Sequence, residues 1–551
     1  MLRFRPRLLD ELRDYDRSKL AADVSAGLTV AAVALPLAMA FAIASGLKPE
    51  AGLFTAIVAG FLISALGGSR VQIGGPAGAF VVVVYAIVQR YGVANLLLAT
   101  MMAGVLLFLM GAFRLGNLVR FVPVTIVIGF TNGIAVLIIL SQLPDFFGLK
   151  VDALPADFIL KLRALAHAAP TADPVTIALG VASFGVIWAW PRLWRSGKGA
   201  ASRFMRHIPG TIVGLVLGTA AVTLLQLHVP TIGTRFGGIP QSLPQLSWPH
   251  LGWPEISLLF GPAFTIALLG SIESLLCARV ADAVIEDRHD PNQELMAQGI
   301  ANIAAPLFGG FCATGTIART MTNVRSGART PVAGMVHAAA LLVVMLVAAP
   351  LASLVPLATL AAVLLYVAYY MGEWHEFARL RQFSYYYRLV LLTTFFLTVV
   401  VDLTVAVQVG LVLACLFFIA RISGLTRVEP IQELEESVAG VDARKVEAFR
   451  ISGSLFFGAV SKMDGLLDPK RRLPRVMILD LAQLLNMDNT GLETIETLHR
   501  MLLKRDATLI LSGLQEQPKW LVSQSGLAAL IGAENLVPSL AEAWRRARQL
   551  G

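Results

Sequence analysis

Long apolar stretches recur along most of the chain and limit what it can fold into. From Asp23 to about Ser423, stretches of roughly 17 to 25 residues follow one another, each long enough to cross a bilayer as a helix. Only 15% of the residues are charged, whereas an average soluble protein has about 25%. The sequence therefore predicts a polytopic α-helical membrane protein, with the lipid bilayer as its surroundings.

Fourteen membrane segments are predicted in this region. Their ranges are 24–46, 51–67, 75–88, 94–113, 121–143, 174–191, 208–227, 255–281, 292–310, 314–325, 332–350, 353–371, 387–402 and 404–423. With the N-terminus inside, most Lys and Arg residues of the loops fall on the inner side, and this positive-inside pattern predicts that both termini are cytoplasmic. The net charge of +9 is then explained by topology, and we expect no nucleic-acid partner.

The N-terminus and the cysteines exclude other classes of protein. The first residues are basic and lack an early apolar core, so we expect no cleaved signal peptide. The three cysteines lie in apolar segments, which predicts neither a disulfide framework nor a metal site. A multi-pass protein of a bacterial-type inner (plasma) membrane is the expected result.

Two of the predicted segments, 75–88 and 314–325, are too short to cross a bilayer, at on the order of 12–14 residues. Each follows a glycine pair, Gly67-Gly68 or Gly309-Gly310. They are third and tenth in order, the same place in two halves of seven segments. Interrupted helices at corresponding positions indicate a transporter site near the midplane, between inverted repeats. Ordinary glycine-rich loops are the alternative interpretation.

The second short segment contains Arg319, so a cationic side chain lies at membrane depth. A buried cation beside the free amides of a helix start is suited to an anion. We predict that Arg319 contacts the substrate, and that Phe41 lines the site with its ring edge unless it serves packing alone. A role for Arg319 only as a partner of Glu273 is the alternative. The predicted amide donors are Thr316, Ile317, Ala318, Ala77, Gly78 and Ala79.

Several segments resemble the SulP family of anion permeases, the family that includes prestin. They are residues 315–334, with Ile-Ala-Arg-Thr, Asn-Val-Arg-Ser-Gly and Arg-Thr-Pro-Val-Ala-Gly, and the shorter runs 33–42, 74–78 and 130–134. The resemblance implies a fold of seven plus seven inverted segments, in which a mobile core domain carries the anion past a scaffold-like gate domain. It also aligns Arg319 with the arginine that contacts the anion in relatives.

Glu273, in the eighth segment, is the candidate for binding a coupling ion, Na⁺ or H⁺. A buried carboxylate is suited to either cation, and an acidic residue in this place has that role in relatives. A structural partnership with Arg279 or Arg319 is the alternative. Many bacterial relatives carry Glu or Gln after the proline of the first segment, where this chain has Leu37, so proton coupling through that position is in doubt.

The lone His337 lies in an apolar predicted helix and is interpreted as a satisfied core residue.

After about Val428 the sequence changes to that of a small α/β domain. The run 476–480 predicts a buried strand, the apolar residues from Leu492 to Leu502 have helical spacing, and the run 508–512 predicts the next strand. This pattern resembles a STAS domain. Thr490 matches the place of a phosphorylated hydroxyl in related domains, but helix capping is its more common role.

The predicted domains are a cytoplasmic segment (1–22), a transport domain (23–425), a linker (426–439) and a STAS domain (440–551). We predict a secondary transporter of sulfate, bicarbonate or a C4-dicarboxylate that works by an elevator-like movement. An anion channel or uncoupled exchanger, and a nucleobase permease, are the alternatives. No enzyme activity or cofactor is expected beyond a coupling ion. A homodimer and a cytoplasmic partner of the STAS domain are expected.

Overall fold

A computed structural model describes residues 4–117, 122–151, 154–194, 205, 208–242, 246, 252–431, 445–468 and 470–550. The chain folds as two compact units, Met1–Leu411 and Val412–Gly551. This division falls inside helix α18 (Leu403–Leu425), ahead of the predicted end of the transport domain at residue 425. Residues 432–439 of the predicted linker lie outside the described residues.

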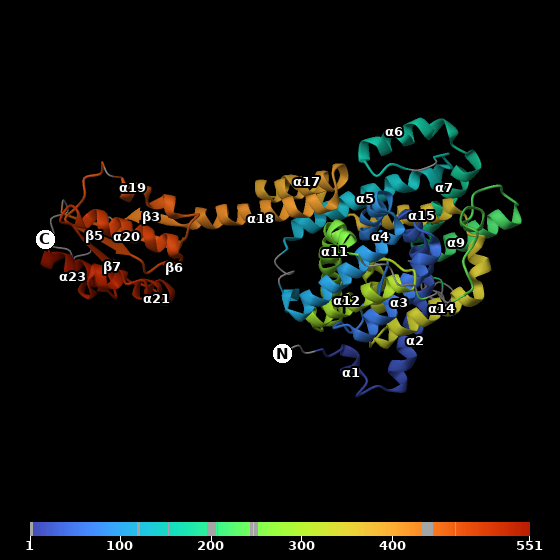
Figure 1. Cartoon of the computed structure of the whole chain (residues 1–551), viewed down its shortest axis with the longest axis horizontal. Helices are drawn as coiled ribbons and strands as arrows, with labels where there is room; N and C mark the ends of the chain where they lie inside the picture. Colours follow the sequence, from blue (N-terminus) through green and yellow to red (C-terminus); the bar gives the residue numbers. More distant parts are fainter. Residues whose placement is uncertain are drawn as a thin grey trace. The chain divides into compact units, whose positions relative to one another are not determined.

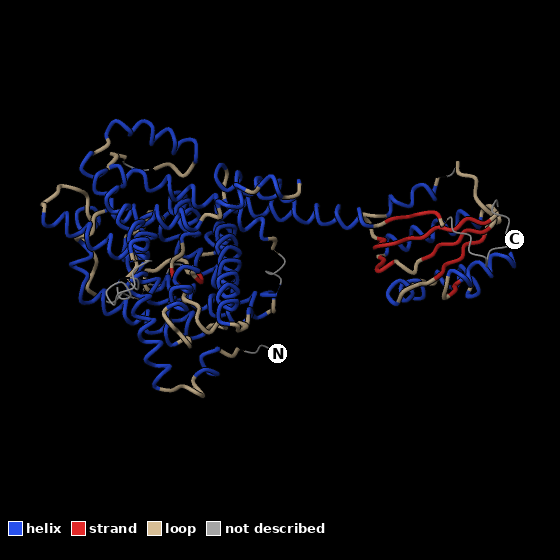
Figure 2. Tube along the Cα trace, turned by 180° about the vertical axis from the view of Figure 1, so that it is seen from behind, coloured by secondary structure: helices blue, strands red, loops and turns tan. Residues whose placement is uncertain are grey.

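The first unit is built from helices (Figures 1 and 2). In chain order these are α1 (Arg7–Glu11), α2 (Arg17–Ala44), α3 (Pro49–Leu66), α4 (Gly78–Ala112), α5 (Val124–Phe147), α6 (Phe158–Ala168), α7 (Pro174–Leu193), α9 (Gly210–Leu224), α10 (Ile232–Phe236), α11 (Trp253–Ile285), α12 (Pro291–Leu307), α13 (Ile317–Arg325), α14 (Val332–Ser353), α15 (Leu357–Met371), α16 (Trp374–Ala378) and α17 (Tyr385–Val400). Eight helices of the described part, counting α18, are long and apolar enough to cross a membrane.

Every predicted membrane segment coincides with a helix, although two of them share one. The predicted segments 75–88 and 94–113 both fall in α4, which breaks at Gly92, where φ is 81° and ψ is 168°. A glycine adopts this conformation without the steric penalty that a side chain brings. Helix α4 is therefore a half-helix and a membrane span joined at a sharp bend.

The helices of the first unit form two groups. Helix α4 packs most extensively against α11 and α12, α14 packs against α2 and α3, and α13 packs against α2 and α11. In the second group, α5 packs against α15 and α17, while α7 packs against α9 and α15. We call the first group the core domain and the second the gate domain. The core helices approach closely: a Cβ added at Gly104 of α4 would lie 2.7 Å from the carbonyl oxygen of Gly299 in α12.

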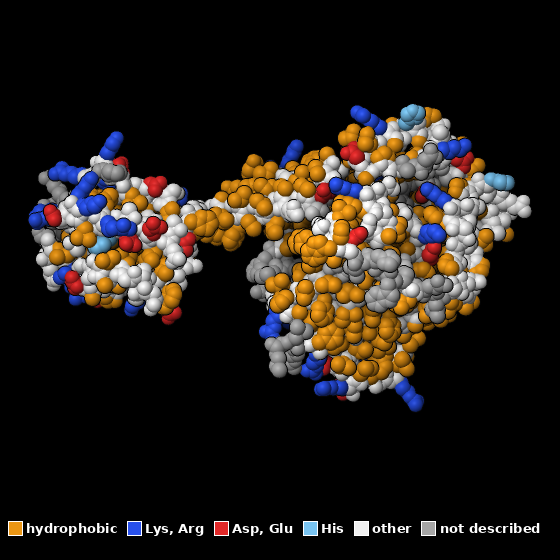
Figure 3. All heavy atoms as spheres, in the orientation of Figure 1, with side chains coloured by type: hydrophobic (Ala, Val, Ile, Leu, Met, Phe, Trp, Pro, Cys, Tyr) orange, Lys and Arg blue, Asp and Glu red, His pale blue; other side chains and the backbone are white. Residues whose placement is uncertain are grey.

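The surface of the first unit agrees with a location in the bilayer. Hydrophobic side chains cover its middle, whereas charged side chains gather near the face that carries α6 and near the opposite face that carries the N-terminus (Figure 3). Charged groups are costly within the hydrocarbon layer, so they collect where a membrane protein meets water. The chain is a multi-pass membrane protein.

The second unit is a mixed sheet flanked by helices (Figure 2). Its strands are β3 (Arg427–Pro430), β4 (Val446–Leu455), β5 (Val476–Asp480), β6 (Leu484–Met487), β7 (Thr508–Ser512) and β8 (Leu536–Val537), and its helices are α19 (Asp464–Leu467), α20 (Asn489–Leu503), α21 (Glu516–Gln524), α22 (Leu527–Ile531) and α23 (Leu540–Leu550). The strand order is β3-β4-β5-β7-β8, with β6 beside β4. The predicted strands 476–480 and 508–512 are β5 and β7, which pair in parallel.

The capping role predicted for Thr490 is wrong. Helix α20 is capped by Asp488, whose carboxylate accepts a hydrogen bond from the amide of Gly491 at 2.8 Å. Thr490 already lies inside the first turn, and its carbonyl oxygen accepts a hydrogen bond from the hydroxyl of Thr494 at 2.7 Å. Its hydroxyl is therefore not used by the cap, and phosphorylation of Thr490 stays a prediction.

Candidate functional site

Two short strands from the two halves of the chain meet inside the core domain. Strand β1 (Gly74–Gly75) and strand β2 (Thr314–Gly315) pair antiparallel, with Gly75 opposite Thr314. Helix α4 begins three residues after β1 and α13 begins two residues after β2. The starts of both half-helices therefore lie beside one strand pair, which is buried in protein as non-helical backbone at membrane depth must be.

Arg319 in the first turn of α13 is buried, with 1% of its surface exposed. Neither Nη1 nor Nη2 has a hydrogen-bond partner. No ion pair joins Arg319 to Glu273 or to another acid of the described residues, so the alternative role as a helix-pairing residue finds no support. A buried charge without a partner costs free energy, and its N–H groups are free to bind a ligand.

The guanidinium of Arg319 reaches back over Gly75. A Cβ added at Gly75 would lie 2.4 Å from Nη1 of Arg319, and Gly75 has a φ of 152°. A side chain at this position would therefore be strained and would displace the guanidinium of Arg319. Nothing in the residues around Gly75 indicates that an arginine far along the chain will cover it.

One of the six predicted amide donors, that of Thr316, is already engaged within the protein. The amide of Thr316 donates to the carbonyl oxygen of Ile73 at 2.9 Å, so it is not free. The amides of Ile317 and Ala318 open α13, where the first N–H groups of a helix have no intrahelical partner. On the other half-helix, Phe80 makes the first hydrogen bond of this type, to the carbonyl oxygen of Ala77. The amides of Ala77, Gly78 and Ala79 precede it.

Phe41 lies in α2, and its ring approaches the start of α4. A Cβ added at Gly78 would lie 3.4 Å from Cε1 of Phe41, so the ring edge is in contact range of this helix start. The same position is 3.3 Å from Sδ of Met371, at the end of α15. Met371 belongs to the gate domain and had no signal in the sequence.

Glu273 is half-buried on α11, close to the strand pair. Its Oε2 atom is buried and has no hydrogen-bond partner. One turn earlier in the same helix, the carbonyl oxygen of Gly270 accepts a hydrogen bond from Thr314 of β2 at 3.0 Å. A buried carboxylate oxygen without a donor is suited to a proton or a small cation. Among the described residues, no ion pair joins Glu273 to Arg279.

The interpretation of His337 as a satisfied core residue is wrong. His337 lies on α14 with no exposed surface, and neither ring nitrogen has a hydrogen-bond partner. A histidine in an apolar helix gives no sequence signal for such a state, because the state depends on the packing of other helices. His337 thus joins Arg319 as a buried polar group with unused capacity.

Polar side chains anchor both strands. Asn302 of α12 accepts a hydrogen bond from the amide of Ala313 at 2.8 Å and donates to the carbonyl oxygen of the same residue at 2.9 Å. Glu294, about two turns earlier in the same helix, is completely buried and accepts hydrogen bonds from the amides of Gly68 and Ser69 at 3.0 and 3.2 Å. Glu294 had no signal in the sequence that indicated this role. Helix α12 therefore fixes the segments that lead into β1 and β2.

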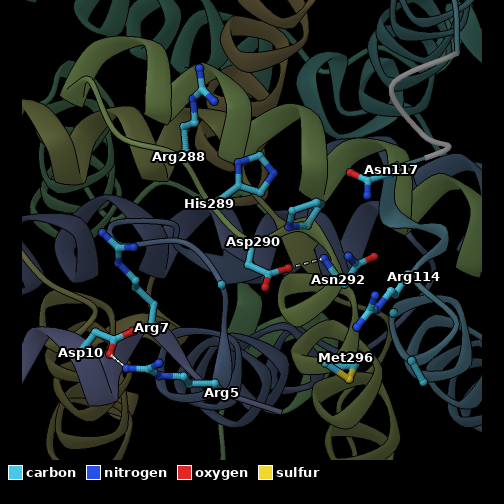
Figure 4. A pocket seen from close by; sticks show the side chains of 14 residues that line it. Arg5, Arg7, Asp10, Arg114, Asn117, Arg288, His289, Asp290, Asn292 and Met296 are labelled. Atoms are coloured by element: carbon cyan, nitrogen blue, oxygen red, sulfur yellow. Dashed lines mark hydrogen bonds and ion pairs between the residues drawn. The ribbon is translucent and has the colours of Figure 1, made fainter. Parts of the chain in front are cut away.

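A separate pocket of about 630 Å³ opens on the face that carries the N-terminus (Figure 4). Its lining includes the N-terminal segment and the loop between α11 and α12, and Arg5 pairs there with Asp10. Asp290 accepts a hydrogen bond from the amide of Asn292 at 2.9 Å. The lining contains none of the predicted substrate residues.

Comparison with known proteins agrees with this architecture. Residues 20–394 match the model of the sulfate permease family, and residues 442–543 match the STAS domain. The chain is 40% identical over 531 residues to the putative sulfate transporter YvdB of Bacillus subtilis, covering 96% of this chain and 98% of that protein. It is 33% identical over 459 residues to the bicarbonate transporter BicA of a Picosynechococcus strain, covering 79% and 78%.

Solved structures show the same fold. The transmembrane domain of a cyanobacterial bicarbonate transporter BicA has a TM-score of 0.64 and 33% identity, covering 72% of this chain and 98% of that one. Murine Solute Carrier 26 family member A9 has a TM-score of 0.86 at 17% identity, covering 99% and 94%, which is a likeness of fold. With helices in two groups, paired half-helices and a C-terminal STAS domain, the chain belongs to the sulfate permease family and is an anion transporter of that type, not an enzyme.

Proposed function

We propose that this protein is a secondary transporter that holds a small anion between the starts of α4 and α13. The observation that carries the proposal is the buried Arg319, whose two terminal nitrogens have no partner. Its planar guanidinium matches a carboxylate or an oxyanion with two parallel hydrogen bonds. The free amides of both helix starts add hydrogen-bond donors, which carry partial positive charge and so also attract an anion.

Sulfate, bicarbonate and a C4-dicarboxylate are the proposed substrates. Two relatives carry sulfate or bicarbonate in their names, and all three anions present oxygens that a guanidinium recognises. A nucleobase permease is a weaker candidate, because a neutral ring would leave the buried charge of Arg319 uncompensated.

An elevator-like movement of the core domain is the proposed mechanism. The site residues Arg319 and Gly78 lie on core helices, whereas Met371, in contact range of Gly78, ends a gate helix. Sliding of the core domain past such a contact would carry the anion without opening the strand pair. A channel or uncoupled exchanger remains the alternative mechanism, since Leu37 replaces a carboxylate of some relatives.

Uptake into proteoliposomes tests the function. Labelled sulfate, bicarbonate and fumarate are each offered with an imposed Na⁺ or H⁺ gradient. Accumulation of one anion under one gradient would identify the substrate and the coupling ion. Flux without gradient dependence would favour the exchanger or channel, and no flux of any of the three would contradict the proposal.

Glu273 is the proposed site of the coupling ion. Replacing Glu273 with Gln keeps the shape of the side chain and removes the negative charge that a cation requires. We expect the gradient-driven accumulation ratio to fall to about 1 while anion exchange continues. The measurement is accumulation with and without the gradient, and Glu255→Gln, in the first turn of the same helix, is the matched control. Coupling that survives in Glu273→Gln would exclude this role.

The second unit is proposed to support assembly and rate, and to bind a cytoplasmic partner. Deleting residues 440–551 should lower expression or the maximum rate of uptake and leave the order of anion preference unchanged, because Arg319 and both half-helix starts are in the other unit. Competition by unlabelled anions measures that order. An altered preference in the truncated protein would contradict this assignment.

We also propose the membrane, the orientation and the assembly of the protein. The predicted inner loops carry most of the loop Lys and Arg residues, and this supports cytoplasmic termini for a protein of the inner membrane. A homodimer is the proposed assembly. Cross-linking in native membranes and protease access to the STAS domain test these two points.

A further inference from the structure

A second pocket, of about 540 Å³, lies between the core and gate domains near α6. We call it the α6-side pocket. Its walls include Ile43 of α2 and Val81 of α4, which follow the site residues Phe41 and Gly78 by two and three residues. Such spacing corresponds to about 3–5 Å along a helix. Measured along the same two helices, these wall residues therefore lie within about one turn of the candidate site residues.

Lys161 of α6 lines this pocket and has only 5% of its surface exposed. Its Nζ atom lies 5.6 Å from the ring centroid of Tyr85 on α4. The hydroxyl of Tyr85 donates to the carbonyl oxygen of Leu154, which holds the ring in place. An aromatic ring attracts the ammonium but leaves its charge uncompensated. Burial lowers the pKa of Lys161, as expected for a cation that lacks an acidic neighbour.

The other charged groups around the pocket are engaged elsewhere. Arg235 of α10 pairs with Asp145 of α5 at 2.5 Å. Asp157 caps α6 by accepting a hydrogen bond from the amide of Leu160 at 2.9 Å, and Asp402 accepts from the amide of Val405 at 2.8 Å. No ion pair joins any of these acids to Lys161 in the described part of the chain.

We propose that Lys161 is a second contact for the transported anion, made when the Arg319 site communicates with the α6-side pocket. The inference rests on the proposed function, and it adds a residue of α6 to the binding path. An anion in the pocket would supply the charge that the ammonium lacks and accept its N–H groups. Because α6 lies on the face opposite the N-terminus (Figure 1), the contact serves binding from that face alone.

The test compares the two faces of the membrane. KM for the transported anion is measured in right-side-out and inverted vesicles that contain Lys161→Met. We expect KM to rise about tenfold for anion added on the α6 side, as for one lost hydrogen bond to a charged group, and to be unchanged on the other side. Lys161→Arg should keep the wild-type value. Arg163→Met removes an exposed cation of the same helix and should have no effect.

Two results would overturn the inference. An unchanged KM on the α6 side excludes the contact, and an equal change on both sides assigns Lys161 to packing against Tyr85. A second measurement does not depend on transport. Lys161 is labelled with a small amine-reactive reagent with and without sulfate, bicarbonate or fumarate, and mass spectrometry measures the labelled fraction. An anion that contacts Lys161 should lower that fraction. If the wild-type protein moved none of these anions, the proposed function would fail, and protection alone would decide for or against the Lys161 contact.

Discussion

Replacing Arg319 with Ala is expected to abolish saturable anion uptake while the protein stays folded. The substitution removes two unpartnered nitrogens that are proposed to bind the anion and, with them, at least about 3 kcal/mol of binding, or more than about a hundredfold in affinity. It breaks no ion pair of the described structure, so folding should not suffer. Uptake of labelled anion against concentration measures the first effect, and thermal unfolding in detergent measures the second.

Two further variants make this result specific. Arg319→Lys keeps a charge but loses the planar pair of donors, so it should retain a part of the uptake with a raised KM. Arg325→Ala removes the exposed arginine of the last turn of the same helix and should behave like the wild type. Near-normal uptake in Arg319→Ala would remove this residue from the site.

Gly75→Ala is expected to have the second largest effect. Its methyl group would lie 2.4 Å from Nη1 of Arg319, so the guanidinium has to move by about 1 Å to restore an ordinary contact distance. Loss of one charge-assisted hydrogen bond would raise KM at least about tenfold. The positive φ of Gly75 adds backbone strain on the order of 1–3 kcal/mol for an alanine. Uptake kinetics and thermal unfolding together separate these two contributions.

The matched control is Gly185→Ala in the gate helix α7. An added Cβ there meets no atom within 4 Å, and alanine has a higher helix propensity than glycine. This variant should transport like the wild type and be at least as stable. If Gly75→Ala kept a normal KM, the close approach of Arg319 to Gly75 would not be part of the anion-binding state.

Local patterns predicted much of this architecture. The lengths of the apolar stretches predicted the membrane segments, because a helix that crosses a bilayer must be apolar over about 20 residues. The glycine pairs before residues 75 and 314 predicted both half-helices. The strands 476–480 and 508–512 were likewise readable from apolar runs. In each case the signal lies within about 20 neighbouring residues.

The remaining features depend on contacts between distant residues. Gly75 is constrained by Arg319, the amide of Thr316 is occupied by Ile73, and Lys161 is buried against Tyr85. No local pattern carries this information, since each pair joins different elements of the fold. The prediction that Thr490 caps a helix failed for another reason. Asp488, two residues before Thr490, occupies the N-cap position of α20.

The strand pair β1–β2 also bears on how such a site arises. Each half of the chain supplies one strand and one helix start, and Arg319 of the second half covers Gly75 of the first. One half alone has an unpaired strand edge in the membrane and lacks either the arginine or the glycine that accommodates it. A single repeat is therefore not a functional unit, and an ancestor of half this length would have required two copies inserted in opposite orientations.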